Sequence, residues 1–426
     1  MARCELITFT PHSPEVVDGK LSWVPLKSGA MEGLPQLCWE SGEPWREANL
    51  WLLSRAYRQN IETVRSNAKA LHAYAQWLES TDPPIHWWDF PAKEKDRCLV
   101  RFRGFLIKQR EAGNLAPSTA SARMRAVVRF YRWVYAERLI TPQWPMWHER
   151  NVVIKLDSTD YFERTVVVTT TDLAIPNRKR NSAGLENGVM PVSPEERDAI
   201  LTLVDAHGSL ELALMLRLGF YTGMRLGSIC DLKVNTILHA IPEPCVPDAR
   251  LISIGPNARP PVHTKGGTYG HITVPGKLIE DLTQYAASLR RRERQALAQR
   301  DDKSLLFLTR FGNPYVKRQA NKSSAVNVEM HKLRSIARAA GANLAHFHFH
   351  MTRATFACEV MRLALQIEGI DPVAVVGEML FHSSRRTTEA YVHYLKKQPI
   401  KAEVANEFTK VFLGCMKRPT EKHERV

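Results

Sequence analysis

The sequence predicts a mainly helical protein of the α+β class, with two helical domains and a small antiparallel sheet in the second. Apolar residues recur at three- and four-residue spacing in several long segments, which is typical of helices that pack on one face. β-Branched runs are short and concentrate in residues 146–190 and 251–274. With 426 residues, the chain is long enough for two or three domains that each bury a core.

Composition and periodicity divide the chain into five segments. Residues 1–45 are rich in proline and glycine and show no sustained periodicity, so we expect an N-terminal extension there. Residues 46–145 predict a compact helical bundle, and 146–190 predict an interdomain linker with short strands and a basic, turn-rich stretch. Residues 191–400 form the second predicted domain. The tail, 401–426, carries an apolar stripe at helical spacing: Val404, Phe408, Val411 and Phe412.

Within the bundle, helices are predicted over about 61–78 and 95–111, and a third begins at Pro117. Gly113 ends the second helix, and proline suits the first turn of the third. Four arginines of the third helix fall largely outside its apolar face: Arg123, Arg125, Arg129 and Arg132. Such a face is either solvated surface or, in a basic protein, a contact surface for phosphate.

The second domain begins at Ser193, where a capping serine is followed by Pro194 and two glutamates. The stretch 251–274 alternates and contains the pair Gly266–Gly267, which predicts strands with a hairpin turn. Further helices are predicted over 194–206, 209–221, 276–299, about 323–340 and 352–365. A basic face is expected on the 276–299 helix, from Arg290, Arg291, Arg292 and Arg294.

The charge balance indicates a polyanionic partner. Lysine and arginine number 59 against 44 aspartate and glutamate, a formal net charge of +15. A merely basic soluble protein is the alternative. The seven cysteines are odd in number and contain no CxxC pair, which argues against a disulfide framework and a zinc site. No apolar run has the length of a membrane span and the first residues lack a signal-peptide core, so we expect a cytoplasmic protein.

Six residues of the second domain suit phosphodiester chemistry: Arg225, Lys265, His350, Arg353, His382 and Tyr391. Planar guanidinium groups can bind the non-bridging oxygens of a phosphodiester transition state bidentately, which suits both arginines as clamps. Lys265, on a predicted hairpin tip, can protonate a leaving 5′ oxygen. Tyr391 offers a phenolic nucleophile that requires a nearby base or a cationic field. His350 fits the base, and His382 can hydrogen-bond the phosphate.

The order and spacing of these residues resemble the tyrosine recombinase, or phage integrase, family. The run 221–225 (YTGMR) is similar to the first arginine box of that family, and 350–357 (HMTRATFA) is similar to its His-x-x-Arg box. The run 380–391 resembles the third box, with the tyrosine nine residues after the histidine. Lys265 stands in the expected β-hairpin between the first two boxes. The resemblance covers roughly residues 46–415.

Two positions depart from the family pattern. Ser228 stands where glutamate is frequent three residues after the first arginine, and Asp231 is a possible substitute for it. Phe381 replaces the glycine that usually precedes the histidine of the third box. We expect this phenylalanine to alter local packing without changing the chemistry, because neither departure removes a catalytic group.

Two neighbouring motifs offer rival interpretations. Histidines alternate with phenylalanines in residues 346–350, where a metal site is one alternative. The alternation predicts instead a short extended segment with Phe347 and Phe349 turned inward, and with His346 and His348 as packing or phosphate-facing neighbours. Tyr394 is the rival of Tyr391 as nucleophile, but the spacing from His382 favours Tyr391 and leaves Tyr394 as a packing residue.

The resemblance implies a SAM-like helical core-binding bundle and a mixed helical catalytic domain that close as a C-shaped clamp around duplex DNA. It implies attack by Tyr391, a 3′-phosphotyrosine intermediate and a free 5′ hydroxyl that attacks the partner duplex. Neither ATP, a metal nor another cofactor is required. It further implies a homo-tetramer on two DNA sites, a Holliday junction, accessory DNA-bending factors, a tail that docks in trans, and a bacterial, nucleoid-associated location.

Several functions remain open at this point. An integrase of a mobile genetic element is favoured by the additional N-terminal segment and the long linker. A Xer-type dimer resolvase, a telomere resolvase and an integron-type integrase belong to the same class. A type IB topoisomerase uses a similar constellation but reseals the same strand, and a DNA-binding protein without catalysis would form no covalent DNA adduct.

Overall fold

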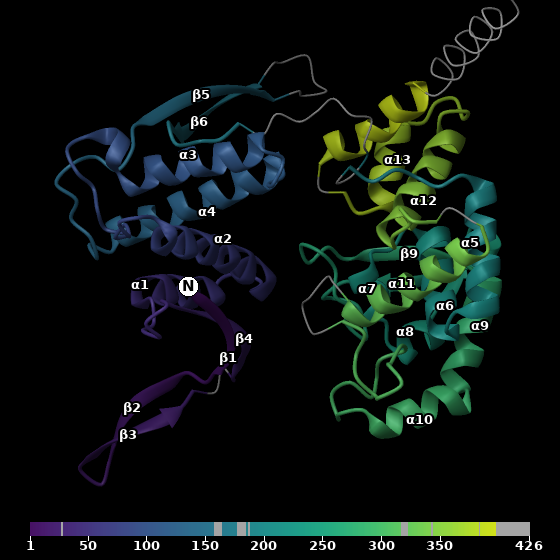
Figure 1. Ribbon diagram of the computed structural model, residues 1–426. Coiled ribbons are helices and arrows are strands. Elements are labelled where there is room, and N and C mark those ends of the chain that lie inside the picture. Colours follow the sequence, from purple (N-terminus) through teal and green to yellow (C-terminus); the bar gives the residue numbers. More distant parts are fainter. Residues whose placement is uncertain are drawn as a thin grey trace, which may run out of the picture. The chain divides into compact units, whose positions relative to one another are not determined.

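The computed structural model describes residues 1–26, 29–156, 164–176, 185, 188–316, 323–341, 344–382 and 384–397. The chain divides into two compact units, Met1–Arg180 and Asn181–Val426 (Figure 1). Both are mainly helical with small antiparallel sheets, which confirms the predicted fold class. Over these residues no helix is long and apolar enough to cross a membrane. The predicted basic stretch 177–184 and the apolar stripe of the tail lie outside the described residues.

The first unit is a helical bundle around an aromatic core. Its helices are α1 (Arg46–Ala56), α2 (Ile61–Ser80), the 3₁₀ turn η1 (Glu94–Asp96), α3 (Cys98–Glu111) and α4 (Pro117–Ala136). The three helices that periodicity predicts are confirmed, with α3 beginning at Cys98. Trp45, Trp51, Tyr74, Phe102 and Phe130 are fully buried between them. Their ring contacts, such as Trp45 against Phe130 at 5.3 Å between centroids, make the bundle a single packed core.

The first 45 residues form strands rather than an irregular extension. Strand β1 (Arg3–Phe9) pairs with β4 (Met31–Cys38), and β2 (His12–Val17) pairs with β3 (Lys20–Pro25). The side chain of Asn49 in α1 hydrogen-bonds both backbone groups of Leu37, at 2.7 and 2.9 Å. Leu37 is buried in the same core as the helices. This segment is therefore an integral part of the first unit.

The β-branched runs of residues 149–171 form the short strands that they predict, and the two strands pair as a β-hairpin. Strand β5 (Glu149–Leu156) pairs with β6 (Arg164–Thr171) in antiparallel register, with Glu149 opposite Thr171. Leu173 and Ile175 follow directly and are buried in the core of the first unit. This part of the predicted linker thus belongs to the first unit, because its apolar residues pack there.

The second unit consists of helices around a three-stranded sheet in the order β7-β8-β9. Its elements are α5 (Pro194–His207), α6 (Leu210–Thr222), α7 (Leu226–Cys230), α8 (Val234–Leu238), β7 (Ile241–Glu243), β8 (Val246–Ile254), β9 (Gly270–Pro275), α9 (Gly276–Ala287), α10 (Leu289–Leu297), α11 (Ser324–Ala339), α12 (His350–Ala364), α13 (Pro372–Met379) and a helix over 385–397. The predicted cap at Ser193 is a complete capping box with Glu196. Ten of the thirteen residues of α6 are buried, so this helix lies at the centre of the unit.

The single helix predicted over 276–299 is wrong, because the chain breaks at Ser288. Its backbone is extended there, and its hydroxyl caps α10 by accepting a hydrogen bond from the Arg291 amide. The predicted basic face is also wrong for two of its members. Arg291 and Arg294 are buried, and their guanidinium groups donate to backbone carbonyls of 303–308. These arginines hold a loop rather than facing a polyanion.

Candidate active site

The end of α6 positions the first predicted arginine. Gly223 follows the helix in the left-handed conformation, with φ of 65°, and its amide donates to the carbonyl of Gly219. A Cβ at Gly223 would lie 2.5 Å from Phe356 and 2.8 Å from Leu380, so only glycine fits this turn. Arg225 follows as the N-cap residue of α7, and it is partly buried.

Lys265 is exposed in the connection between β8 and β9, as the hairpin prediction requires. The turn is tight, since the Gly267 amide donates to the Thr264 carbonyl at 3.1 Å and both Gly266 and Gly267 have positive φ. The connection is longer than a hairpin turn, and Gly255 pairs with Val262 within it. This second pairing stiffens the base from which the lysine projects.

Asp231 links the α7 segment to the lysine turn. Its Oδ2 atom accepts a hydrogen bond from the His263 amide at 2.6 Å and lies 2.6 Å from the Lys233 ammonium. His263 is two residues before Lys265. Asp231 therefore anchors the chain that leads into the lysine turn. It lies three residues after Ser228, which occupies the position where the family usually has an acidic residue.

Three of the six predicted residues line one small cavity. Arg225, Lys265 and Arg353 contribute three cationic side chains to its wall. The other lining residues are Thr222, Gly223, Met224, Ser228, Ile254, Thr268, Thr264, Ile272, Met379 and Phe381. No carboxylate lies among these described lining residues. A cavity with this charge suits an oxyanion such as a phosphate.

Arg353 also holds the site together. It lies on α12, is 3% exposed, and donates to the carbonyls of Gly223 at 2.7 Å and Leu380 at 2.6 Å. Gly223 precedes Arg225 by two residues, and Leu380 precedes His382 by two. One guanidinium group thus joins three segments that are far apart in the sequence.

His382 and Tyr391 are ring neighbours. Their centroids lie 6.2 Å apart with an interplanar angle of 18°, and His382 Nδ1 hydrogen-bonds the Thr388 hydroxyl at 2.9 Å. Tyr391 is fully buried on the helix 385–397. Tyr394 packs against the core of the unit, and burial and the nearby Cys358 raise its phenol pKa. This packing fits the role expected of Tyr394.

The alternation before His350 has the predicted facing, but the extended conformation expected there is wrong, because the chain turns at 345–346 and Phe349 is already helical. Phe347 and Phe349 are buried, with Phe347 stacked on Phe220, whereas His346 and His348 are exposed. His350 begins α12 one turn before Arg353, so the two residues share a helix face. His350, His382 and Tyr391 are not among the cavity-lining residues in the described parts of the unit, so the cavity gathers the cations alone.

The two departures from the expected pattern both face this cavity. Ser228 is buried and lines it. Phe381 lines it in a left-handed conformation, with φ of 50°, where the usual glycine would be unstrained. Its ring occupies the space above Gly270, where a Cβ would lie 2.2 Å from the ring. The phenylalanine that replaces the usual glycine is therefore part of the cavity wall.

The arginines predicted to contact DNA lie on α4 of the first unit in three situations. Arg125 and Arg129 are exposed, although the Arg129 guanidinium group is partly covered and donates to the Asn67 side chain at 3.2 Å. This partial burial, together with the neighbouring charges of Arg55 and Arg125, lowers the Arg129 pKa. Arg123 is half-buried. Arg132 lies 3.1 Å from Glu149 of β5, so it forms an ion pair with its own unit.

The second unit is therefore a mainly helical domain with a cationic cavity and a buried tyrosine. Residues 192–398 match the model of the Phage integrase family. The domain formed by these residues belongs to this family, that of the DNA strand-transferring tyrosine recombinases. No curated protein sequence matches the chain.

Several solved structures are similar to the chain at low identity. The XerH site-specific recombinase bound to difH substrate is 16% identical over 83% of this chain and 84% of that one, with a TM-score of 0.47. The Tn1549 transposon integrase with circular intermediate DNA is 11% identical over 81% and 94%, with a TM-score of 0.49. A lambda integrase dimer bound to a COC′ core site is 15% identical over 81% and 76%, with a TM-score of 0.46.

Proposed function

We propose that the chain is the integrase of a mobile genetic element, which cuts and rejoins specific DNA sites through a 3′-phosphotyrosine intermediate. The observation that carries the site assignment is the cavity in which Arg225, Lys265 and Arg353 meet, in the same unit as Tyr391. The choice of a mobile element rests on the additional N-terminal segment, which folds onto the first unit.

The cavity supports a division of roles for the transferred phosphate. Arg225 and Arg353 bind its non-bridging oxygens, where charge develops in the transition state. Two N–H groups of Arg353 already bond carbonyls, so its guanidinium is held in one orientation when the phosphate arrives. Lys265 projects from the exposed turn and donates the proton to the leaving 5′ oxygen.

Tyr391 attacks the phosphorus, with His350 as the base and His382 as a phosphate ligand. The 5′ hydroxyl that is released then attacks the phosphotyrosine of the partner duplex, so the bond energy is conserved without ATP or a divalent metal. Because Tyr391 is fully buried, its helix must shift before the phenol reaches the phosphate. DNA binding supplies the free energy for this shift.

In the first unit, Arg125 and Arg129 contact phosphates. The nearby charges of Arg55 and Arg125 support this role, because a bound phosphate would relieve their repulsion with Arg129. Arg123 lies on the same helix, and Arg132 joins the contact when DNA competes with Glu149. We further propose a homo-tetramer on two DNA sites, a Holliday junction, accessory DNA-bending factors and a cytoplasmic, nucleoid-associated location.

Mapping of covalent protein–DNA junctions tests this function. The full chain is incubated with DNA of its source genome, adducts are captured under denaturing conditions, and the attached ends are sequenced. We expect junctions at a defined site, loss of adduct in Tyr391→Phe with site binding retained, and normal adduct in Tyr394→Phe. Loss of adduct in the second variant alone would contradict the nucleophile assignment.

The joined products separate the remaining alternatives. Joining to a partner duplex at the ends of a mobile element supports the integrase. Resealing of the same strand indicates a topoisomerase, and a junction at a single chromosomal resolution site or a hairpin telomere indicates a resolvase. An absence of adduct from every DNA tested would indicate a DNA-binding protein.

A further inference from the structure

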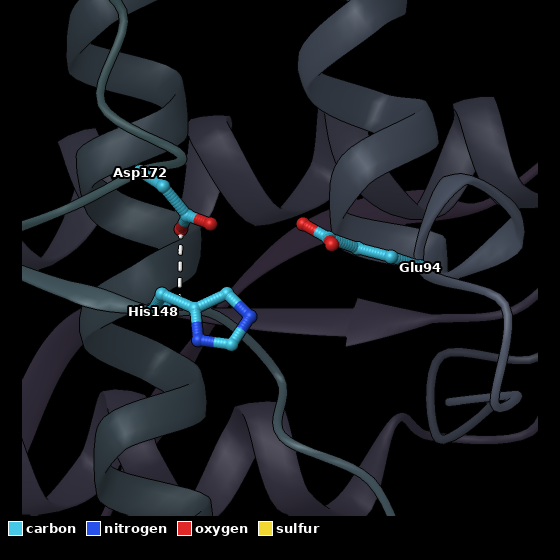
Figure 2. A group of neighbouring side chains, drawn as sticks. All are labelled: Glu94, His148 and Asp172. Carbon is cyan, nitrogen blue, oxygen red and sulfur yellow. Dashed lines mark hydrogen bonds between the residues drawn. The ribbon is translucent and has the colours of Figure 1, made fainter.

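Glu94, His148 and Asp172 converge on one point of the first unit (Figure 2). The ligand atoms of the three side chains all lie within 4.8 Å of one another. Glu94 belongs to η1, His148 directly precedes β5, and Asp172 directly follows β6. We propose that these three residues bind a divalent transition-metal ion, zinc, which connects the base of the β5–β6 hairpin to the start of α3.

Two of the ligands are held together by the backbone. The His148 amide donates to Asp172 Oδ1 at 3.1 Å, and the Asp172 amide donates to the His148 carbonyl at 3.0 Å. The neighbouring Met146 and Leu173 are buried in the core. The imidazole and the carboxylate therefore project from a rigid pair of strands rather than from loose chain ends, which lowers the entropy cost of binding.

One buried arginine holds the third ligand near this pair. Arg97 is 5% exposed and donates to the carbonyls of Pro91 and Ala92, both at 3.1 Å, and of Pro145 at 2.7 Å. The first two carbonyls belong to the turn that carries Glu94, and the third lies three residues before His148. Arg97 thus fixes the distance between the two sides of the proposed site.

The charges and donor types favour a transition-metal ion. The carboxylates of Glu94 and Asp172 face each other, with the imidazole to one side of the gap (Figure 2), and no ion pair to either is found among the residues described in the first unit. A dication would remove the repulsion between them. Nitrogen and oxygen ligands at ~2.0–2.2 Å suit zinc, whereas magnesium prefers oxygen and water.

The geometry requires only small adjustments. Two ligand atoms at a tetrahedral zinc lie ~3.4 Å apart, given bonds of ~2.1 Å, so side-chain rotation within the observed separations closes the site. Glu94 and His148 are exposed, which leaves access for the ion and room for a water as fourth ligand. All three residues belong to the first unit, so the proposal does not depend on the catalytic assignment made in the second.

Zinc binding by the full chain tests the site. Chelator-stripped protein is titrated with zinc by calorimetry, and bound zinc is counted by mass spectrometry of the metal. We expect Glu94→Gln, His148→Ala and Asp172→Asn each to lose one equivalent of bound zinc or to bind it more weakly. The loss of affinity should exceed the ~10–100-fold that follows removal of a hydrogen-bond partner of a metal ligand. Asp96→Asn is the matched control, because Asp96 is an exposed acid of the same turn that pairs with Lys93.

Hydrogen exchange provides a second measurement, because zinc bound elsewhere on the chain would not slow exchange at the base of the hairpin. Zinc should slow exchange of the amides at the base of the hairpin, around 148–151 and 169–172, in wild type and Asp96→Asn but not in His148→Ala. Equal stoichiometry and affinity in wild type and the three ligand variants would overturn the proposal. Binding of magnesium in place of zinc, or zinc binding without slower exchange at the hairpin base, would overturn it as well.

Discussion

Gly223→Ala should destabilise the second unit more than its single methyl group would suggest. The first contribution is conformational, because Gly223 has a φ of 65° and the left-handed conformation costs a residue with a Cβ ~1–2 kcal/mol. The second is steric, because the new Cβ would lie 2.5 Å from Phe356 and 2.8 Å from the fully buried Leu380. Such overpacking costs ~1–3 kcal/mol, so the expected total is ~2–5 kcal/mol.

Gly341→Ala is the matched control for this prediction. Gly341 also follows a helix of the second unit in the left-handed conformation, with φ of 77°, but its Cβ would meet nothing within 4 Å. Only the conformational cost of ~1–2 kcal/mol applies there. The difference between the two variants therefore measures the packing around Gly223.

Tryptophan positions allow the assay to separate the units. All ten tryptophans lie between Trp23 and Trp147, so their fluorescence reports the first unit, whereas far-ultraviolet circular dichroism reports both. In urea, unfolding of the second unit should appear as a change in circular dichroism without a change in tryptophan fluorescence. Gly223→Ala should lower the urea midpoint of this transition. Equal losses of stability in the Gly223 and Gly341 variants would refute the proposed clash.

Three further predictions concern the site and the core. Arg225→Lys keeps the charge but loses the planar fork, so single-turnover cleavage should fall by ~10²–10³; near-normal rates would exclude this residue from the phosphate clamp. Burial by itself would raise the pKa of Glu211, but Arg290 and Arg294 outweigh it and hold that pKa below its usual range. The stability from this pairing is present above the ordinary glutamate pKa of ~4.3 and is lost as pH falls through the lowered value. Glu211→Gln should therefore be less stable than wild type at pH 7, and the difference should shrink under acid, as urea unfolding across pH would show. Cleavage should proceed in excess chelator, and a strict requirement for a divalent ion in the cutting step would contradict the mechanism.

Local signals predicted much of the fold. The apolar spacing of 61–78 predicted α2, and the capping serine at Ser193 predicted the start of α5, because each signal lies within the helix that it predicts. The break at Ser288 was not evident, since the surrounding residues suit a helix. It depends on the hydroxyl that caps α10 and on the buried arginines that follow. Those arginines reach carbonyls more than ten residues away, which periodicity does not report.

The N-terminal strands show the same limit for sheets. β1 and β4 are separated by another hairpin, and a register shift between Ile7 and Phe9 interrupts the alternation that would reveal the strand. For the site, motif order led to all six candidate residues. It could not show that Tyr391 is buried or that Phe381 lines the cavity, because both depend on how separate segments pack.

The contacts of Arg353 have a consequence for engineering. Its guanidinium group bonds the carbonyls of Gly223 and Leu380, so the segments that bear the first arginine and the third motif share one anchor. A chimera that imports the 380–397 segment from another recombinase must reproduce the backbone position of residue 380 to within a hydrogen bond. The segments 223–225, α12 and 380–397 should therefore be transferred only as a set.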